Sequence, residues 1–263
     1  VPNTSPTAAS SGTDLNGKAA QNACIILKQR LVGFAAEHWN VNEDAVRFEN
    51  NHVIITQAEQ DVELPFADFV AMAYTNRISL STTGYYSTPK IHYDREKADG
   101  RPFYYYALGA ACSEVEIDTL TGEYDVLRTD IIQDVGKSLN PAIDIGQIEG
   151  AFVQGMGWLT TEELNWDNSG RLTSNGPATY KIPTAADMPN VFNTRLFDRP
   201  NEEETIYNSK AVGEPPFMLG MAVWMALRDA AASVADYKVN PPMDTPATPE
   251  RVLNAVQFCK AHS

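Results

Sequence analysis

A single carboxylate, Glu214, lies in a stiff stretch of the sequence, residues 210–216 (KAVGEPP). Proline restricts its own backbone and the residue before it, so the proline pair is expected to hold Glu214 in place. The apolar run 217–227 then predicts a mostly buried helix, with Glu214 near its N-terminus. The helix dipole favours an ionised carboxylate there, as a general base requires. The alternative, an ordinary acidic residue of a first helical turn, stays open on this segment alone.

Small and hydroxyl residues fill a second candidate segment, residues 7–13, which precedes a predicted helix. Thr13 or Asp14 is a suitable N-cap for that helix, whose apolar stripe comprises Ala20, Cys24, Leu27 and Leu31. Free backbone N–H groups at a helix N-terminus can bind an anion. A plain flexible loop is the alternative, and the composition by itself favours it.

A third candidate lies in a helix predicted from Asn140-Pro141 to about Leu164. Gly146, Gly150 and Gln154 are spaced four residues apart and share one face of that helix. Glycine inside a helix costs up to about 1 kcal/mol relative to alanine, so we infer that another backbone or a ligand approaches this face. The Gln154 amide can both donate and accept hydrogen bonds. Contact with a ligand and close packing of helices are both possible explanations of this face.

The remaining elements predict a mixed α+β fold. A hairpin is expected at residues 46–56, a short helix at 64–74, and two strands at 104–118 and 124–135 in which apolar and acidic residues alternate. A final helix follows residue 248. We expect two linked subdomains, approximately residues 1–140 and 141–263.

The net charge, the apolar segments and the cysteines of the sequence exclude several classes of function. The net charge of −14 over 263 residues argues against nucleic-acid binding, and no apolar window is long enough to span a membrane. Three isolated cysteines fit a reducing cytoplasm. The sequence has no HExxH, P-loop or spaced acidic cluster, so a metal here must be held by something other than a cage of protein ligands. The chain begins with valine, and we expect a fragment, a processed subunit or a segment of a longer polypeptide.

Several longer motifs occur in order along the chain: residues 1–10 (VPNTSPTAAS), 111–118 (ACSEVEID), 138–147 (SLNPAIDIGQ), 149–155 (EGAFVQG), 176–183 (GPATYKIP), 209–216 (SKAVGEPP) and 245–250 (TPATPE). Together they resemble the C-terminal part of the molybdenum domain of the xanthine dehydrogenases, within the molybdenum hydroxylase family. The resemblance runs through essentially the whole chain and favours the xanthine dehydrogenase branch over the aldehyde oxidase branch.

The resemblance implies a role for each candidate residue. Glu214 matches the family's catalytic glutamate, the expected base in the molybdenum-dependent hydroxylation of hypoxanthine and xanthine to urate. The chain is then one wall of a molybdopterin site, with Ala8 and Ala9 beside the substrate and the backbone of Ala9 near the molybdenum. The positions that match cofactor-binding residues are Ala8, Ala9, Ser10, Thr13 and Gln154.

The resemblance also implies partners. FAD and 2Fe-2S centres are expected in other segments or subunits, passing electrons to NAD. The remaining segment of the molybdenum domain should hold the purine, and a cytoplasmic dimer of multi-part protomers is expected, with this chain inactive alone. Two alternatives remain: an aldehyde or N-heterocycle oxidase of the same family, and an inactive structural piece needed only for assembly.

Overall fold

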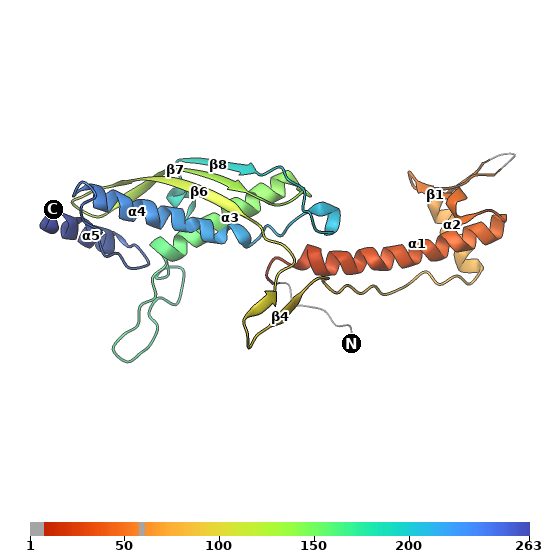
Figure 1. Ribbon diagram of the computed structural model, residues 1–263, viewed down its shortest axis with the longest axis horizontal. Helices are drawn as coiled ribbons and strands as arrows, with labels where there is room; N and C mark the ends of the chain where they lie inside the picture. Colours follow the sequence, from red (N-terminus) through yellow and green to blue (C-terminus); the bar gives the residue numbers. More distant parts are fainter. Residues whose placement is uncertain (1–7, 58–60) are drawn as a thin grey trace. The chain divides into compact units, whose positions relative to one another are not determined.

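The computed structural model describes residues 8–57 and 61–263, which divide into two units at Pro102 and Phe103 (Figure 1). Most of the 1–10 motif, with Thr7 of the predicted anion loop, lies outside the described residues. The division differs from the one expected between residues 140 and 141. The hairpin before residue 140 pairs and packs with elements that come after it, so both belong to one unit.

The first unit contains a long helix, a small sheet and a short helix. Its elements are a π-helical turn (Thr13–Gly17), α1 (Lys18–Trp39), a 3-10 turn (Glu43–Ala45), β1 (Val46–Glu49), β2 (His52–Ile55), β3 (Val62–Pro65), α2 (Phe66–Thr75), β4 (His92–Asp94) and β5 (Asp99–Arg101). β1, β2 and β3 form an antiparallel sheet in that order, and β4 pairs with β5.

The core of this unit lies between α1, the β1–β3 sheet and α2. Leu31 and Phe34 of α1 are buried against Val53, Ile55 and Phe69, so the end of the predicted apolar stripe, at Leu31, lies in this core. The predicted hairpin at 46–56 is confirmed. The predicted helix at 64–74 begins only at Phe66, because the residues before it pair with β2 as strand β3.

The second unit is a sheet covered by helices. Its elements are β6 (Gly109–Ile117), β7 (Tyr124–Gln133), α3 (Pro141–Thr160), a 3-10 turn (Ala185–Asp187), β8 (Val191–Leu196), a 3-10 turn (Ile206–Asn208), a 3-10 turn (Pro215–Gly220), α4 (Met221–Ser233) and α5 (Pro249–His262). β6 and β7 are antiparallel, whereas β8 joins β7 in parallel after the crossover through α3.

One face of this sheet packs on α3 and α4, and Figure 1 shows both helices below it. Phe152 and Ile148 of α3 and Leu227 of α4 are fully buried there with Ile131 of β7. The other face carries charged side chains, including an Arg128–Asp130 ion pair at 2.6 Å. This alternation confirms the two predicted strands, although the first begins at Gly109 and not at residue 104. The mixed α+β fold is confirmed with them.

Candidate functional site

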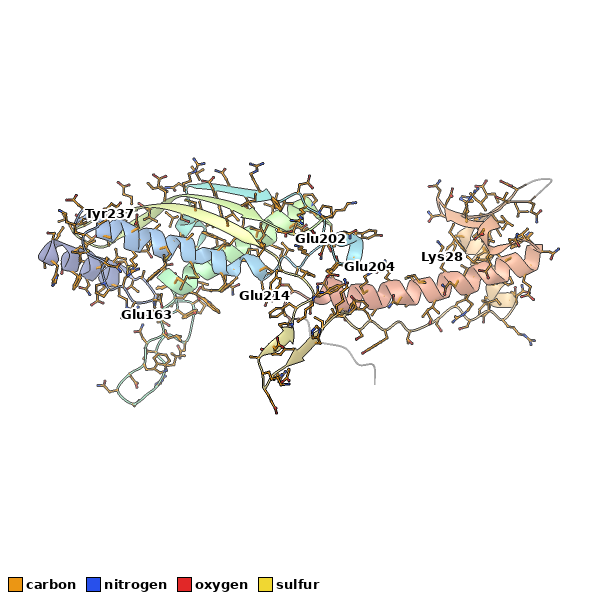
Figure 2. The ribbon with its side chains drawn as sticks, viewed as in Figure 1. Lys28, Glu163, Glu202, Glu204, Glu214 and Tyr237 are labelled. Carbon is orange, nitrogen blue, oxygen red and sulfur yellow. The ribbon has the colours of Figure 1, made fainter. Side chains whose placement is uncertain are left out.

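Glu214 is the N-cap residue of the 3-10 turn Pro215–Gly220, which leads directly into α4. Its side chain is exposed at the N-terminal end of that turn (Figure 2). Its backbone carbonyl accepts the N–H of Phe217 at 2.9 Å, which closes the turn behind the two prolines. The predicted position of Glu214 near a helix start is therefore confirmed.

The helix that follows Glu214 is less buried than expected. Val223 and Leu227 are fully buried, but the side chains of Met218, Met221 and Met225 are 63%, 44% and 52% exposed. The prediction of a mostly buried helix over 217–227 is wrong because α4 lies at the surface of the second unit, so only the side chains that face β6, α3 and α5 are covered.

Gln154 lies on the exposed side of α3, next to a contact between α3 and the turn after Glu214. A Cβ atom added to Gly155 would lie 2.0 Å from the carbonyl oxygen of Phe217. One added to Gly220 would lie 2.4 Å from the backbone nitrogen of Met156. The structure therefore brings the segment that carries Gln154 and the segment that follows Glu214 together at backbone contact.

The glycines singled out from the sequence have a different environment. An added Cβ at Gly146 or Gly150 would meet no atom of the described chain within 4 Å. No described backbone segment approaches that face, so helix packing against it is wrong for these two glycines, and the ligand reading stays a prediction. The close approach occurs instead at Gly155 and Gly157, which the spacing argument passed over.

The loop before α1 belongs to the first unit. Ala8 and Ala9 are exposed, and Ala9 and Ser10 have φ values of 54° and 52°, a region that non-glycine residues adopt rarely and often at ligand sites. The Ser11 N–H and hydroxyl both donate to the carbonyl of Ala8, at 3.2 and 2.9 Å. Glu214 and Gln154 lie in the second unit, so the structure describes the site as two separate groups of residues.

The start of this helix differs from the prediction. The N-cap is Gly12, without a side-chain cap bond, and Thr13 lies inside the π-helical first turn. Capping by Thr13 or Asp14 is therefore wrong, because the helix begins one residue earlier. Of the predicted stripe, Ala20 and Cys24 are exposed.

The residues of this loop fit an anionic organic group. The loop offers the Ser10 and Thr13 hydroxyls and the first N–H groups of a helix, donors that suit phosphate or pterin oxygens. Among the residues that the structure describes, an added Cβ at Gly12 would meet no atom within 4 Å. Across residues 8–57 and 61–263, His, Cys, Asp and Glu side chains do not form a group of three or more that could hold a metal ion.

The sequence is similar to long oxidoreductase chains. It is 48% identical over 259 residues to the xanthine dehydrogenase/oxidase of Gallus gallus, covering 97% of this chain and 17% of that protein. It is 47% identical over 258 residues to aldehyde oxidase 2 of Macaca fascicularis, again covering 97% of this chain and 17% of that protein. The chain thus spans less than a fifth of these relatives, and identity does not separate the two branches.

Solved structures show the same fold. Quinoline 2-oxidoreductase from Pseudomonas putida 86 matches with a TM-score of 0.75 at 24% identity, covering 95% of this chain and 30% of that one. A reconstituted CO dehydrogenase from Oligotropha carboxidovorans matches with a TM-score of 0.77 at 20% identity, covering 100% of this chain and 31% of that one. The family model for the molybdopterin cofactor-binding domain matches residues 1–189. With a match over most of its length, this chain belongs to the molybdopterin cofactor-binding domain family.

Proposed function

We propose that this chain is part of a molybdenum hydroxylase that oxidises hypoxanthine and xanthine to urate, with Glu214 as the general base. The observation that carries the proposal is the geometry of Glu214: an exposed carboxylate at the N-cap of a turn closed behind two prolines. The choice of a purine as substrate rests on the motif resemblance to the xanthine dehydrogenases, because identities of 48% and 47% do not separate the two branches.

In this proposal the chain binds the cofactor and moves one proton. Ser10 and Thr13, with the N–H groups at the start of the π-helical turn Thr13–Gly17, would hold the phosphate or pterin of molybdopterin. Ala8 and Ala9 leave room beside the substrate because their side chains are small, and the Gln154 amide would contact the cofactor. When bound, the cofactor supplies the oxygen that enters the substrate and accepts two electrons. Glu214 takes up a proton on a carboxylate oxygen as the carbon–oxygen bond forms.

Other parts of the enzyme belong to the proposal as well. Because the chain spans about 17% of its relatives, the remaining molybdenum-domain segment and the 2Fe-2S and FAD centres are proposed to lie in further segments or subunits. We propose NAD as the final electron acceptor, a dimer of multi-part protomers and a cytoplasmic location. Among the described residues, no helix is both long and apolar enough to cross a bilayer.

A second candidate is oxidation of aldehydes or N-heterocycles. It is favoured by one observation, the 47% identity to an aldehyde oxidase, which nearly equals the identity to the purine enzyme. The two candidates share Glu214 as the base and differ only in the substrate that the complete site selects.

The test is Glu214→Gln in the complete enzyme, with Glu204→Gln, an exposed glutamate of the same unit, as the control. Urate formation should fall by about 10²- to 10⁴-fold at unchanged molybdenum content, because a general base contributes that much. Full activity at full metal loading would show that Glu214 is only an acidic residue of a first turn. A panel of xanthine, hypoxanthine, an aldehyde and a quinoline on the unmodified enzyme then separates the two candidates.

A further inference from the structure

We propose that Lys210, Asp134 and Tyr105 form an anchor that positions Glu214, and that Lys210 and Tyr105 are positioning residues for its reaction. This inference rests on the proposed role of Glu214 as the base. All three anchor residues lie in the second unit with Glu214, and none is among the residues that the family motifs assign to cofactor or substrate.

The centre of the anchor is a largely buried ion pair. The Lys210 ammonium lies 2.5 Å from a carboxylate oxygen of Asp134, and the two side chains are 13% and 9% exposed. The same ammonium donates to the carbonyl oxygen of Tyr106 at 2.9 Å. The other Asp134 oxygen accepts the N–H of Gly136 at 2.9 Å. Both charges are thus hydrogen-bonded, which a buried pair needs in order to persist.

The backbone beside Lys210 is attached to the same place. The Lys210 N–H donates to the carbonyl of Val135 at 2.7 Å, and Ser209 forms a β-bridge with Gly136. The next N–H, that of Ala211, donates to the Tyr105 hydroxyl at 2.7 Å. The chain therefore arrives at Glu214 from a point that is held by side-chain and backbone bonds together.

The other side of Glu214 is held as well. Phe217 and Gly220 contact the backbone of α3 at Gly155, so the turn after Glu214 cannot slide along that helix. Only residues 212 and 213 separate Glu214 from the Ala211–Tyr105 bond. Because so short a segment has little freedom between two attached ends, a displacement at Lys210 must reach Glu214.

The lysine four residues before the glutamate takes part in a largely buried ion pair. The Lys210 charge is directed to Asp134 and the Tyr106 carbonyl, so it acts through the backbone position of Glu214 and not on substrate. A misplacement of about 1 Å in a catalytic group can lower the rate by about 10²-fold, which sets the scale of the expected effect.

The experiment compares Lys210→Met and Tyr105→Phe, each alone and combined with Glu214→Gln, in the complete enzyme. The matched controls are Lys238→Met and Tyr237→Phe. Lys238 forms an ion pair with Asp236 in which the side chains are 71% and 85% exposed, and Tyr237 is also exposed (Figure 2). We expect Lys210→Met to lower kcat by about 10- to 10²-fold, with KM changed less than about threefold and molybdenum content unchanged.

Combining the variants decides how Lys210 acts. If it works through Glu214, then Lys210→Met and Tyr105→Phe should add less than about a twofold loss in the Glu214→Gln background. Losses of full size in that background would overturn the inference, as would wild-type kcat in both single variants. If Lys210→Met does not fold, Tyr105→Phe decides, because it removes only one hydroxyl. Wild-type activity in Glu214→Gln alone would instead refute the proposed function, and the inference with it.

Discussion

The contact between Gly155 and Phe217 predicts that a single methyl group at position 155 displaces the turn behind Glu214. The added Cβ would lie 2.0 Å from the Phe217 carbonyl oxygen. That is about 1.3 Å short of the roughly 3.3 Å at which carbon and carbonyl oxygen meet. The oxygen belongs to the backbone and cannot rotate away, so Gly155→Ala must separate α3 from the turn.

Substituting alanine for glycine should change the free energy of unfolding with opposite signs at two positions of α3. Gly155→Ala should lower the free energy of unfolding by about 1–3 kcal/mol, the usual cost of overpacking, even after the gain in helix propensity. Gly150→Ala is the matched control, because its Cβ would meet no described atom within 4 Å. It should raise the stability by up to about 1 kcal/mol.

Denaturant unfolding of the chain measures both changes, and amide hydrogen exchange locates them. Gly155→Ala should lose protection in α3 and in the turn Pro215–Gly220, with α1 unchanged. A Gly155→Ala protein as stable as the parent, with unchanged protection, would refute the packing argument. In the complete enzyme, a loss of bound molybdenum in Gly150→Ala would support the ligand reading of this open face.

Two further predictions concern the same unit. Burial raises the pKa of Tyr124 to about 12. Because the unfolded chain ionises Tyr124 at a lower pH than the folded chain does, the free energy of unfolding is unaffected below about pH 10 and falls as the pH rises toward 12. The expected fall is on the order of 2 kcal/mol, and Tyr124→Phe should abolish it. Parallel titration curves for the two proteins would contradict this. Gly122→Ala should destabilise more than Gly170→Ala: both glycines have positive φ, at +79° and +81°, but only at Gly122 would the Cβ collide, 2.0 Å from the Pro249 carbonyl. Equal losses in denaturant unfolding would refute the collision.

Local patterns predicted the parts of the fold that local physics controls. The alternation in β6 buries Val115 and Ile117 more than Glu114, because successive side chains of a strand point to opposite faces. Asn140 caps α3, accepting the Ile143 N–H at 3.4 Å, and Pro141 occupies the first helical position. The start of α3 could be predicted from the sequence because the residues that determine it, the cap and the first-turn proline, are adjacent in the chain.

Contacts between residues that are remote in sequence could not be predicted from the sequence. The spacing of Gly146 and Gly150 correctly places them on one helical face but carries no information on what that face meets. Position 155 must lack a Cβ because the backbone of Phe217, which is remote in sequence, lies against it. The boundary between the two units was missed for the same reason, since β8 joins β7 only after the α3 crossover.

The pairing of Lys210 with Asp134 was likewise invisible in the sequence, where the two residues are 76 positions apart. Its consequence for function follows from entropy. Ordering a residue's backbone costs about 1–2 kcal/mol, and a base that had to be ordered during each turnover would add that cost to the barrier. The anchor at Lys210 and the contact at Gly155 order the backbone around Glu214 when the chain folds. An exposed carboxylate on an ordered backbone suits the role proposed for Glu214, because such a base meets a substrate without searching for its own position.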